Sequence, residues 1–143
     1  MKSNIELGQL GENLACEYLV KKGYKIIERN FRQKWGELDI IAKVPNKTLV
    51  FVEVKTLRQS SGQAPEEQLS PEDQLTCSKL QKLKRTASLY AGHRQELIKD
   101  EKGWRIDLIT LTLREISGST LNESNGLTIK EECCDIKHYE NIA

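Results

Sequence analysis

Apolar and polar residues alternate along two neighbouring segments of the chain, 36–42 (GELDIIA) and 50–55 (VFVEVK). Successive side chains of a strand point to opposite faces of a sheet, so a period of two predicts two strands joined by a short turn. The even positions are all apolar and predict a core-facing side: Leu38, Ile40, Ala42, Val44, Val50, Val52 and Val54. The odd positions are apolar near the middle of the two segments and charged at the end away from the turn, where Asp39, Glu53 and Lys55 lie.

Apolar residues at helical spacing predict a first helix from about Asn4 to Lys22, which Gly23 ends. The main apolar stripe of this helix is formed by Leu7, Leu10, Leu14 and Tyr18. A second helix is predicted from Pro71 to about His93, because proline is favoured at the first position of a helix.

Three further segments are typical of strands: 24–31, 104–113 and 127–136. The resulting order is one helix, three strands, one helix and two strands. This order predicts an α/β fold in which a central mixed sheet of about five strands is flanked by helices. A length of 143 residues fits one domain, 1–143, with an acidic segment from about residue 115.

The charged ends of the two paired strands are the main candidate for chemistry. Pairing about Asn46 places Asp39 opposite Glu53 and Glu37 opposite Lys55, with opposed Cβ atoms roughly 4.5–5.5 Å apart. Opposed like charges destabilise a sheet, and a divalent cation would neutralise them. Two carboxylates with a cation and a lysine are the minimal equipment of a metal-dependent nuclease. The competing interpretation is a solvated strand face, because a Glu-x-Lys triplet is common in unrelated proteins.

The composition narrows the class of protein. A hydrophobic content of 38%, a charged content of 30% and a net charge of +1 are typical of a soluble globular protein. No apolar run approaches the length of a membrane span, and no signal-peptide pattern is present. None of the four cysteines forms a C-x-x-C pair and the two histidines are isolated, which argues against a zinc site. We therefore expect no membrane partner and a location in the reducing cytoplasm.

Charge is unevenly distributed along the chain. Segment 21–34 carries six basic residues and one acidic residue, and segment 79–94 carries five basic residues and none that is acidic. The segment from residue 115 onward is net acidic. Two basic segments beside an acidic centre would hold a phosphate backbone. The alternative is that each is an amphipathic element with a solvated basic face.

Glu12 lies to one side of the apolar stripe of the first helix, with Gly8, Ala15 and Leu19 nearby. This position is at the margin of the core, next to the predicted sheet. A solvated glutamate is the usual outcome at such a position. A third carboxylate beside a metal site is the alternative.

Several stretches of the chain, taken together, resemble a known family. They are GQLGENLACEYLVKKGYKIIERNFR, WGELDIIA, LVFVEVKT, the helical segment from Lys79 to Tyr90, WRIDLITL and IKHYENIA. This combination covers nearly the whole chain and resembles the YraN-like family of bacterial proteins, which is assigned to the PD-(D/E)xK nuclease superfamily. The resemblance implies a restriction endonuclease-like core, similar to that of Holliday-junction resolvases.

The resemblance also implies roles for individual residues. Asp39 corresponds to the motif aspartate, Glu53 to the variable acid and Lys55 to the motif lysine. Glu12 corresponds to a glutamate that resolvase-like members place near the metal. The implied cofactor is Mg²⁺, with Mn²⁺ as a substitute, held by Asp39, Glu53, Glu12 and the carbonyl of Val54.

Other positions are implied as supporting residues. Glu37 would be an outer carboxylate beside the metal ligands, and Lys79 a phosphate contact. Further expected nucleic-acid contacts are Arg32, Arg58 and Lys82. Leu57 stands where the family usually has an arginine, which removes one phosphate contact.

The implied activity is hydrolysis of phosphodiester bonds in DNA, such as branched or damaged DNA in repair or recombination. We expect DNA to be recognised by its shape, because no base-reading helix motif is evident in the sequence. A symmetric branched substrate would favour a homodimer. The alternative function is a non-catalytic nucleic-acid-binding or protein-interaction module on the same fold.

Overall fold

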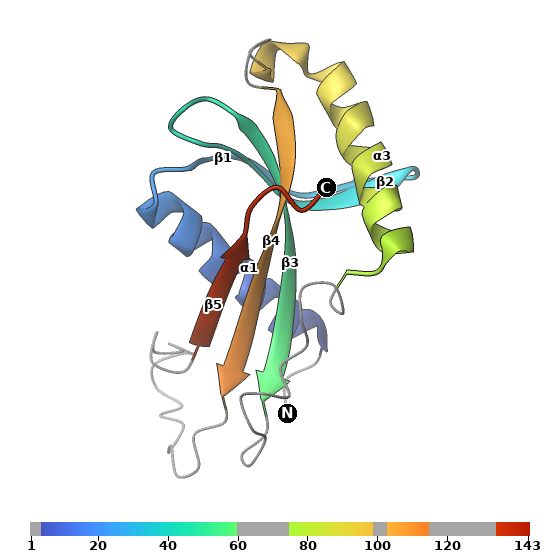
Figure 1. Ribbon diagram of the computed structural model, residues 1–143. Helices are drawn as coiled ribbons and strands as arrows, with labels where there is room; N and C mark the ends of the chain where they lie inside the picture. The colour runs from blue at the N-terminus through green and yellow to red at the C-terminus, as the bar shows by residue number, and fades with distance from the viewer. Residues whose placement is uncertain (1–3, 60–74, 99–102, 115–133) are drawn as a thin grey trace.

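The computed structural model describes residues 4–59, 75–98, 103–114 and 134–143. These residues form one five-stranded sheet in the order β1-β2-β3-β4-β5, with α-helices packed against it (Figure 1). The elements are α1 (Asn4–Lys21), β1 (Lys25–Gln33), β2 (Gly36–Lys43), β3 (Leu49–Gln59), α3 (Cys77–His93), the 3₁₀ helix η2 (Gln95–Leu97), β4 (Trp104–Arg114) and β5 (Cys134–Tyr139). β3 and β4 are parallel and the other neighbours are antiparallel. The predicted α/β fold with a mixed sheet of about five strands and flanking helices is confirmed.

The two helices cover opposite faces of the sheet, because both faces of the central strands are apolar. The residues that pack under α1 include Ile40, Ala42, Val50 and Val52. Those that pack under α3 include Ile41, Leu49 and Phe51. All seven are at most 2% exposed. Strands that are buried on both faces therefore read as nearly continuous apolar runs.

Helix α1 contacts the sheet through a narrower stripe than the one predicted. Gly11, Ala15 and Leu19 are buried, whereas the predicted stripe residues are only half-buried: Leu7, Leu10, Leu14 and Tyr18. A Cβ atom at Gly11 would lie 1.8 Å from Oγ1 of Thr56. The missing side chain of Gly11 therefore lets α1 approach β3 closely, and this approach moves the contact stripe.

The end of α1 is the one predicted. Gly23 has φ of +90°, a conformation that glycine adopts without steric cost. The N–H of Tyr24 donates to the carbonyl of Leu19 at 2.9 Å, as in a Schellman motif. No helix within the described ranges has the length and the hydropathy needed to cross a membrane.

The start of the second helix differs from the prediction. Helix α3 begins at Cys77, after the non-helical residues 75 and 76, so a continuous helix from Pro71 is wrong. The hydroxyl of Thr76 accepts a hydrogen bond from the N–H of Lys79 at 3.2 Å. The first N–H groups of a helix have no partner within the helix, and a threonine side chain that accepts from one of them fixes the start of the helix.

The last strand also has a different end. β5 continues to Tyr139, beyond the predicted end at Ile136, because its pairing with β4 extends to Leu108↔Tyr139. The part of the predicted strand before residue 134 lies outside the described residues, as does most of the acidic segment.

Candidate active site

The predicted site residues lie where β2 and β3 diverge. Their pairing has the register predicted about Asn46 and ends at Ile40↔Val52. Beyond this pair, Oδ2 of Asp39 accepts a hydrogen bond from the N–H of Val54 at 2.9 Å. The N–H and C=O of one residue in an extended strand point to the same edge. The carbonyl of Val54 therefore lies on the edge of β3 that faces Asp39.

An interruption of the strand alternation accompanies the placement of Asp39. The β1–β2 pairs on either side of Asp39 involve Leu38 and Ile40, and between them β1 carries Asn30 with φ of +52°. Leu38 packs on the α3 side of the sheet and Ile40 on the α1 side. The prediction that all even positions share one face is therefore wrong at Leu38. Irregularities of this kind re-aim side chains beside functional sites.

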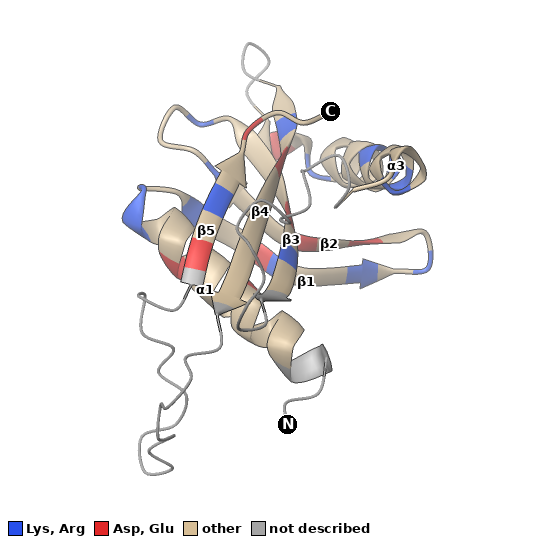
Figure 2. Cartoon of the chain, turned by 60° about the horizontal axis from the view of Figure 1, so that its bottom comes forward, with Lys and Arg blue, Asp and Glu red and all other residues tan. Residues whose placement is uncertain are grey.

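Asp39, Glu53 and Lys55 line a cleft of about 330 Å³ between α1 and β3. The other residues of its walls are Leu7, Gly8, Glu12, Val54 and Thr56. Acidic and basic positions of β2 and β3 lie next to each other at this end of the strands (Figure 2). The close approach of α1 to Thr56 brings Glu12 to the same cleft. The structure thus brings together in one cleft the four residues that we predicted from the sequence as catalytic: Asp39, Glu53, Lys55 and Glu12.

Glu53 and Asp39 are a strongly interacting pair of carboxyl groups. The side chain of Glu53 is 20% exposed, and its Oε1 lies 3.9 Å from Nζ of Lys55. Burial, followed by the negative charge of Asp39, raises the pKa of Glu53 from 4.5 to about 8, against the positive charge of Lys55. Burial also raises the pKa of Asp39, against the hydrogen bond from Val54. Near neutral pH the metal-free pair holds a proton that a divalent cation would replace.

Glu12 interacts with this pair from α1. With its nitrogen turned toward Glu12, the amide of Asn30 donates a hydrogen bond to Oε2 at 2.7 Å. Burial, followed by the negative charge of Asp39, raises the pKa of Glu12, and the positive charge of Arg29 opposes this rise. Glu12 is therefore close enough to share the electrostatics of the cleft.

Basic side chains approach the cleft from two directions. The charges of Arg29 and Arg32 on β1 lower the pKa of Glu12. The charge of Lys79 on α3 lowers the pKa of Glu53. The two basic segments of the sequence, although far apart along the chain, thus converge on one acidic site. Lys82 is exposed on α3 and is not part of the cleft wall.

The remaining predicted positions are less closely involved. Glu37 is exposed and pairs with Arg32 in the β1–β2 ladder, while its charge raises the pKa of Asp39. The predicted juxtaposition of Glu37 and Lys55 would lie beyond the last β2–β3 pair. Leu57 is half-buried on β3, and the side chain of Arg58 lies outside what the structure describes.

The donor set of the cleft suits a hard divalent cation. Among the described residues, no three His, Cys, Asp or Glu side chains form a ready-made metal cage. Mg²⁺ does not need one, because it keeps several waters and is held by one or two carboxylates together with substrate phosphates. The cleft offers two adjacent carboxylates and a neighbouring backbone carbonyl, with no nitrogen or sulfur ligand in its wall. Oxygen ligands of this kind fit Mg²⁺ or Mn²⁺.

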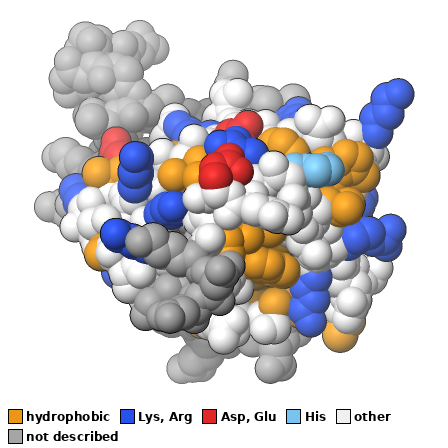
Figure 3. All heavy atoms as spheres, turned by 90° about the horizontal axis from the view of Figure 1, so that it is seen from above, with side chains coloured by type: hydrophobic (Ala, Val, Ile, Leu, Met, Phe, Trp, Pro, Cys, Tyr) orange, Lys and Arg blue, Asp and Glu red, His pale blue; other side chains and the backbone are white. Residues whose placement is uncertain are grey.

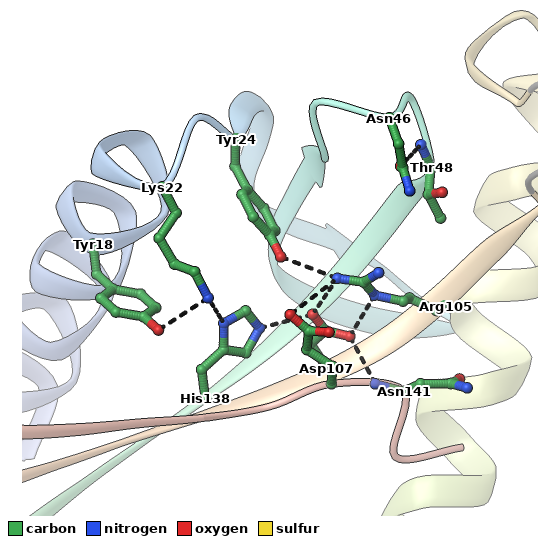
Figure 4. A network of polar contacts seen from close by, with 10 residues as sticks. Tyr18, Lys22, Tyr24, Asn46, Thr48, Arg105, Asp107, His138 and Asn141 are labelled. Atoms are coloured by element: carbon green, nitrogen blue, oxygen red, sulfur yellow. Dashed lines mark hydrogen bonds and ion pairs between the residues drawn. The ribbon is translucent and has the colours of Figure 1, made fainter.

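Sequence reasoning missed a buried polar network on β4 and β5 (Figure 4). Asp107 is fully buried and accepts hydrogen bonds from Nε of Arg105 at 3.0 Å, from Nε2 of His138 at 2.8 Å and from the N–H of Asn141 at 2.9 Å. Burial favours the neutral acid, but these hydrogen bonds outweigh it and hold the pKa of Asp107 below its ordinary value. The one signal in the sequence was a carboxylate inside the apolar run WRIDLITL.

The network continues to the end of α1. Nζ of Lys22 lies 3.3 Å from Nδ1 of His138 and donates to the hydroxyl of Tyr18 at 3.2 Å. Because an ammonium group only donates, Nδ1 accepts, and we assign the ring proton of His138 to Nε2. The side chain of His138 is only 3% exposed. This cluster therefore joins β5 to α1 and does not form an open site.

The fold and the cleft define the class of the protein. A mixed five-stranded sheet with a helix on each face, and an Asp and a Glu-x-Lys triplet on adjacent central strands, form a restriction endonuclease-like α/β core. The chain belongs to the uncharacterised protein family UPF0102, whose profile matches residues 11–111. The predicted membership of the YraN-like family is thereby confirmed.

Curated relatives agree with this assignment. The chain is 42% identical over 114 residues to the UPF0102 protein of Thermodesulfovibrio yellowstonii, which covers 80% of this chain and 92% of that protein. It is 39% identical over 114 residues to the UPF0102 protein of Syntrophus aciditrophicus, and this match covers 80% of this chain and 82% of that protein. It is 48% identical over 87 residues to the UPF0102 protein of Syntrophomonas wolfei, and this match covers 61% of this chain and 70% of that protein.

Proposed function

We propose that this protein is a metal-dependent endonuclease that hydrolyses phosphodiester bonds in DNA. The observation that carries the proposal is the half-buried pair Asp39 and Glu53, with Lys55 beside it in an open cleft. Burying two carboxyl groups side by side is unfavourable unless a cation or a proton neutralises them. Titratable groups whose pKa is strongly perturbed in a cleft are characteristic of functional sites.

The roles of the residues follow from their positions. Oxygen atoms of Asp39 and Glu53, with the carbonyl of Val54, would hold Mg²⁺. The bound ion would supply a water of lowered pKa and would stabilise negative charge on the phosphate. The ammonium group of Lys55 would donate a hydrogen bond to the attacking water or to a phosphate oxygen. Glu12 would act as an additional carboxylate on the opposite wall of the cleft.

The distribution of charge supports DNA as the substrate. Arg29 and Arg32, whose charges act on Glu12, and Lys79, whose charge acts on Glu53, would hold phosphates before and after the scissile bond. The end of the molecule where β4 begins and α3 ends has a mixed surface instead (Figure 3). Acidic, basic and hydrophobic side chains are interspersed on that face. The cleft is therefore the better candidate for binding the phosphates next to the scissile bond.

A cleavage assay tests the proposal. Purified protein is incubated with Mg²⁺ or Mn²⁺ and a panel of four-way junction, flap, duplex and single-stranded DNA. We expect cleavage of at least one substrate, and a loss of about 100-fold or more in Lys55→Ala and in Asp39→Asn. Lys47→Ala is the matched control, because Lys47 is an exposed lysine on the β2–β3 turn, and it should retain full activity.

Metal binding separates this function from the alternative. Calorimetry should detect Mg²⁺ or Mn²⁺ binding to the parent protein and a weakened affinity in Asp39→Asn. Binding of DNA without cleavage of any substrate, together with no detectable metal binding, would favour a non-catalytic nucleic-acid-binding module.

A further inference from the structure

A second cleft, larger than the candidate active site, lies between α3, the start of β4 and the residues that follow β5. Its volume is about 570 Å³, against about 330 Å³ for the candidate active site. Its walls include Lys84, Arg85, Ser88, Trp104, Arg105 and Asn141. Among the described residues, no Asp or Glu lines this cleft, although a carboxylate oxygen of Glu140 lies 3.8 Å from the guanidinium group of Arg105.

Two of its cations are uncompensated. Arg105 is already neutralised by Asp107, at 3.0 Å from Nε to Oδ1. Lys84 and Arg85, in contrast, form no ion pair or side-chain hydrogen bond with any residue in the described part of the chain. Unpaired Lys and Arg side chains on a surface attract phosphate groups.

The same cleft presents an aromatic ring. Trp104 is half-buried, and its ring packs edge-on against Phe51 with centroids 5.5 Å apart and an interplanar angle of 84°. This contact holds the indole in place while its remaining surface lines the cleft. A base can stack on such a ring whatever its sequence, for about 1–3 kcal/mol.

Helix α3 lines the second cleft and, at its first turn, carries a cation that acts on the candidate active site. Lys79, whose charge acts on Glu53, lies six residues before Arg85 on the helix. This separation is about 9 Å along the helix axis at 1.5 Å per residue. The described helix contains no acidic residue, and only basic positions are coloured on it in Figure 2.

We propose that the second cleft binds a single-stranded segment of nucleic acid, with phosphates at Lys84 and Arg85 and a base stacked on Trp104. This inference rests on the proposed function, because the strand is the one whose other end enters the candidate active site. A half-buried indole reaches an unstacked base but not one inside a duplex, so the occupant is a single strand. The substrate would therefore carry a single-stranded region close to the cleaved bond.

The test measures binding in EDTA, so that no cleavage occurs. Because the chain has two tryptophans, a Trp35→Phe background leaves Trp104 as the only fluorescent indole. Oligothymidylate should quench this fluorescence. The double variant Lys84→Gln/Arg85→Gln should weaken binding about fivefold to tenfold and reduce the slope of log K against log salt by about 1.4, or 0.7 for each lost phosphate contact. Arg85→Gln alone should give half of the change in slope.

Controls separate this site from the candidate active site. Lys47→Gln removes an exposed lysine of the β2–β3 turn, outside both basic segments, and should leave affinity and salt slope unchanged. Asp39→Asn should abolish cleavage but retain oligothymidylate binding, so failure of the nuclease proposal would not affect this result.

Three outcomes would overturn the inference. In the first, Lys84→Gln/Arg85→Gln retains the parental affinity and salt slope. In the second, duplex DNA quenches Trp104 as strongly as a single strand does. In the third, thymidine monophosphate binds as tightly as oligothymidylate, which would identify a site for free nucleotides.

Discussion

The substitution Glu53→Gln should change how the stability of the metal-free protein depends on pH. Burial, followed by the charge of Asp39, raises the pKa of Glu53 from 4.5 to about 8 in the folded state. Between these two values the folded protein holds a proton that the unfolded chain has released. Because the folded state binds more protons there, the free energy of unfolding falls as pH rises from 4.5 to 8.

The magnitude follows from the width of this interval. From 4.5 to about 8, at 1.36 kcal/mol per pH unit, the upper limit is about 5 kcal/mol. The side chain is one-fifth exposed, and solvent reduces the penalty, so we expect a loss of about 3 kcal/mol. Glutamine has nearly the same shape and carries no charge. Glu53→Gln should therefore remove most of the loss and should be more stable than the parent at pH 8.

The assay is urea denaturation in EDTA at a series of pH values. Glu37→Gln is the matched control, because Glu37 is an exposed glutamate on the adjacent strand and its removal leaves Glu53 in place. Saturating Mg²⁺ should flatten the pH profile of the parent and leave that of Glu53→Gln nearly unchanged. The reasoning is refuted if Glu53→Gln keeps the parental pH dependence or is less stable than the parent at pH 8.

Four other substitutions test the packing described above. Gly11→Ala should destabilise the protein by about 1–3 kcal/mol, because its Cβ would overlap Thr56. Gly8→Ala, with no atom within 4 Å of the added Cβ, should instead stabilise the protein by about 0.5–1 kcal/mol. Equal changes in the melting temperatures of the two variants would contradict this prediction. Asp107→Asn should cost about 3 kcal/mol in urea denaturation at pH 7, because it leaves the guanidinium group of Arg105 without its buried carboxylate partner. The stability due to Asp107 is present above its ordinary pKa of 3.8 and should be lost as pH falls below it. If Asp107→Asn and the parent lose stability equally between neutral and acidic pH, the network does not stabilise the fold in this way. Thr76→Ala should cost about 1 kcal/mol by loss of the α3 cap, and an unchanged denaturation midpoint would show that the cap is dispensable.

The local pattern of the sequence was sufficient to predict the central strands and the register of their pairing. A period of two fixed which residues of β3 share a face, and therefore placed Glu53 next to Lys55. Gly23 predicted the end of α1 for an equally local reason, since a helix ends where a residue can adopt a positive φ. The start of α3 was predicted wrongly because two local signals competed, and the cap at Thr76 determined it where Pro71 did not.

Other features depend on contacts between distant parts of the chain, and only the tertiary structure decided them. Glu12 reaches the cleft because Gly11 lets α1 approach Thr56, which is 45 residues away. Asp107 is stabilised by His138, 31 residues away, although this histidine looked isolated in the sequence. The sequence by itself determined which charged side chains lie together on β2 and β3, because strand periodicity is a property of neighbouring residues. The packing of the helices decided which further groups face that chemistry, because a helix can present several faces and only close contact with the sheet selects one.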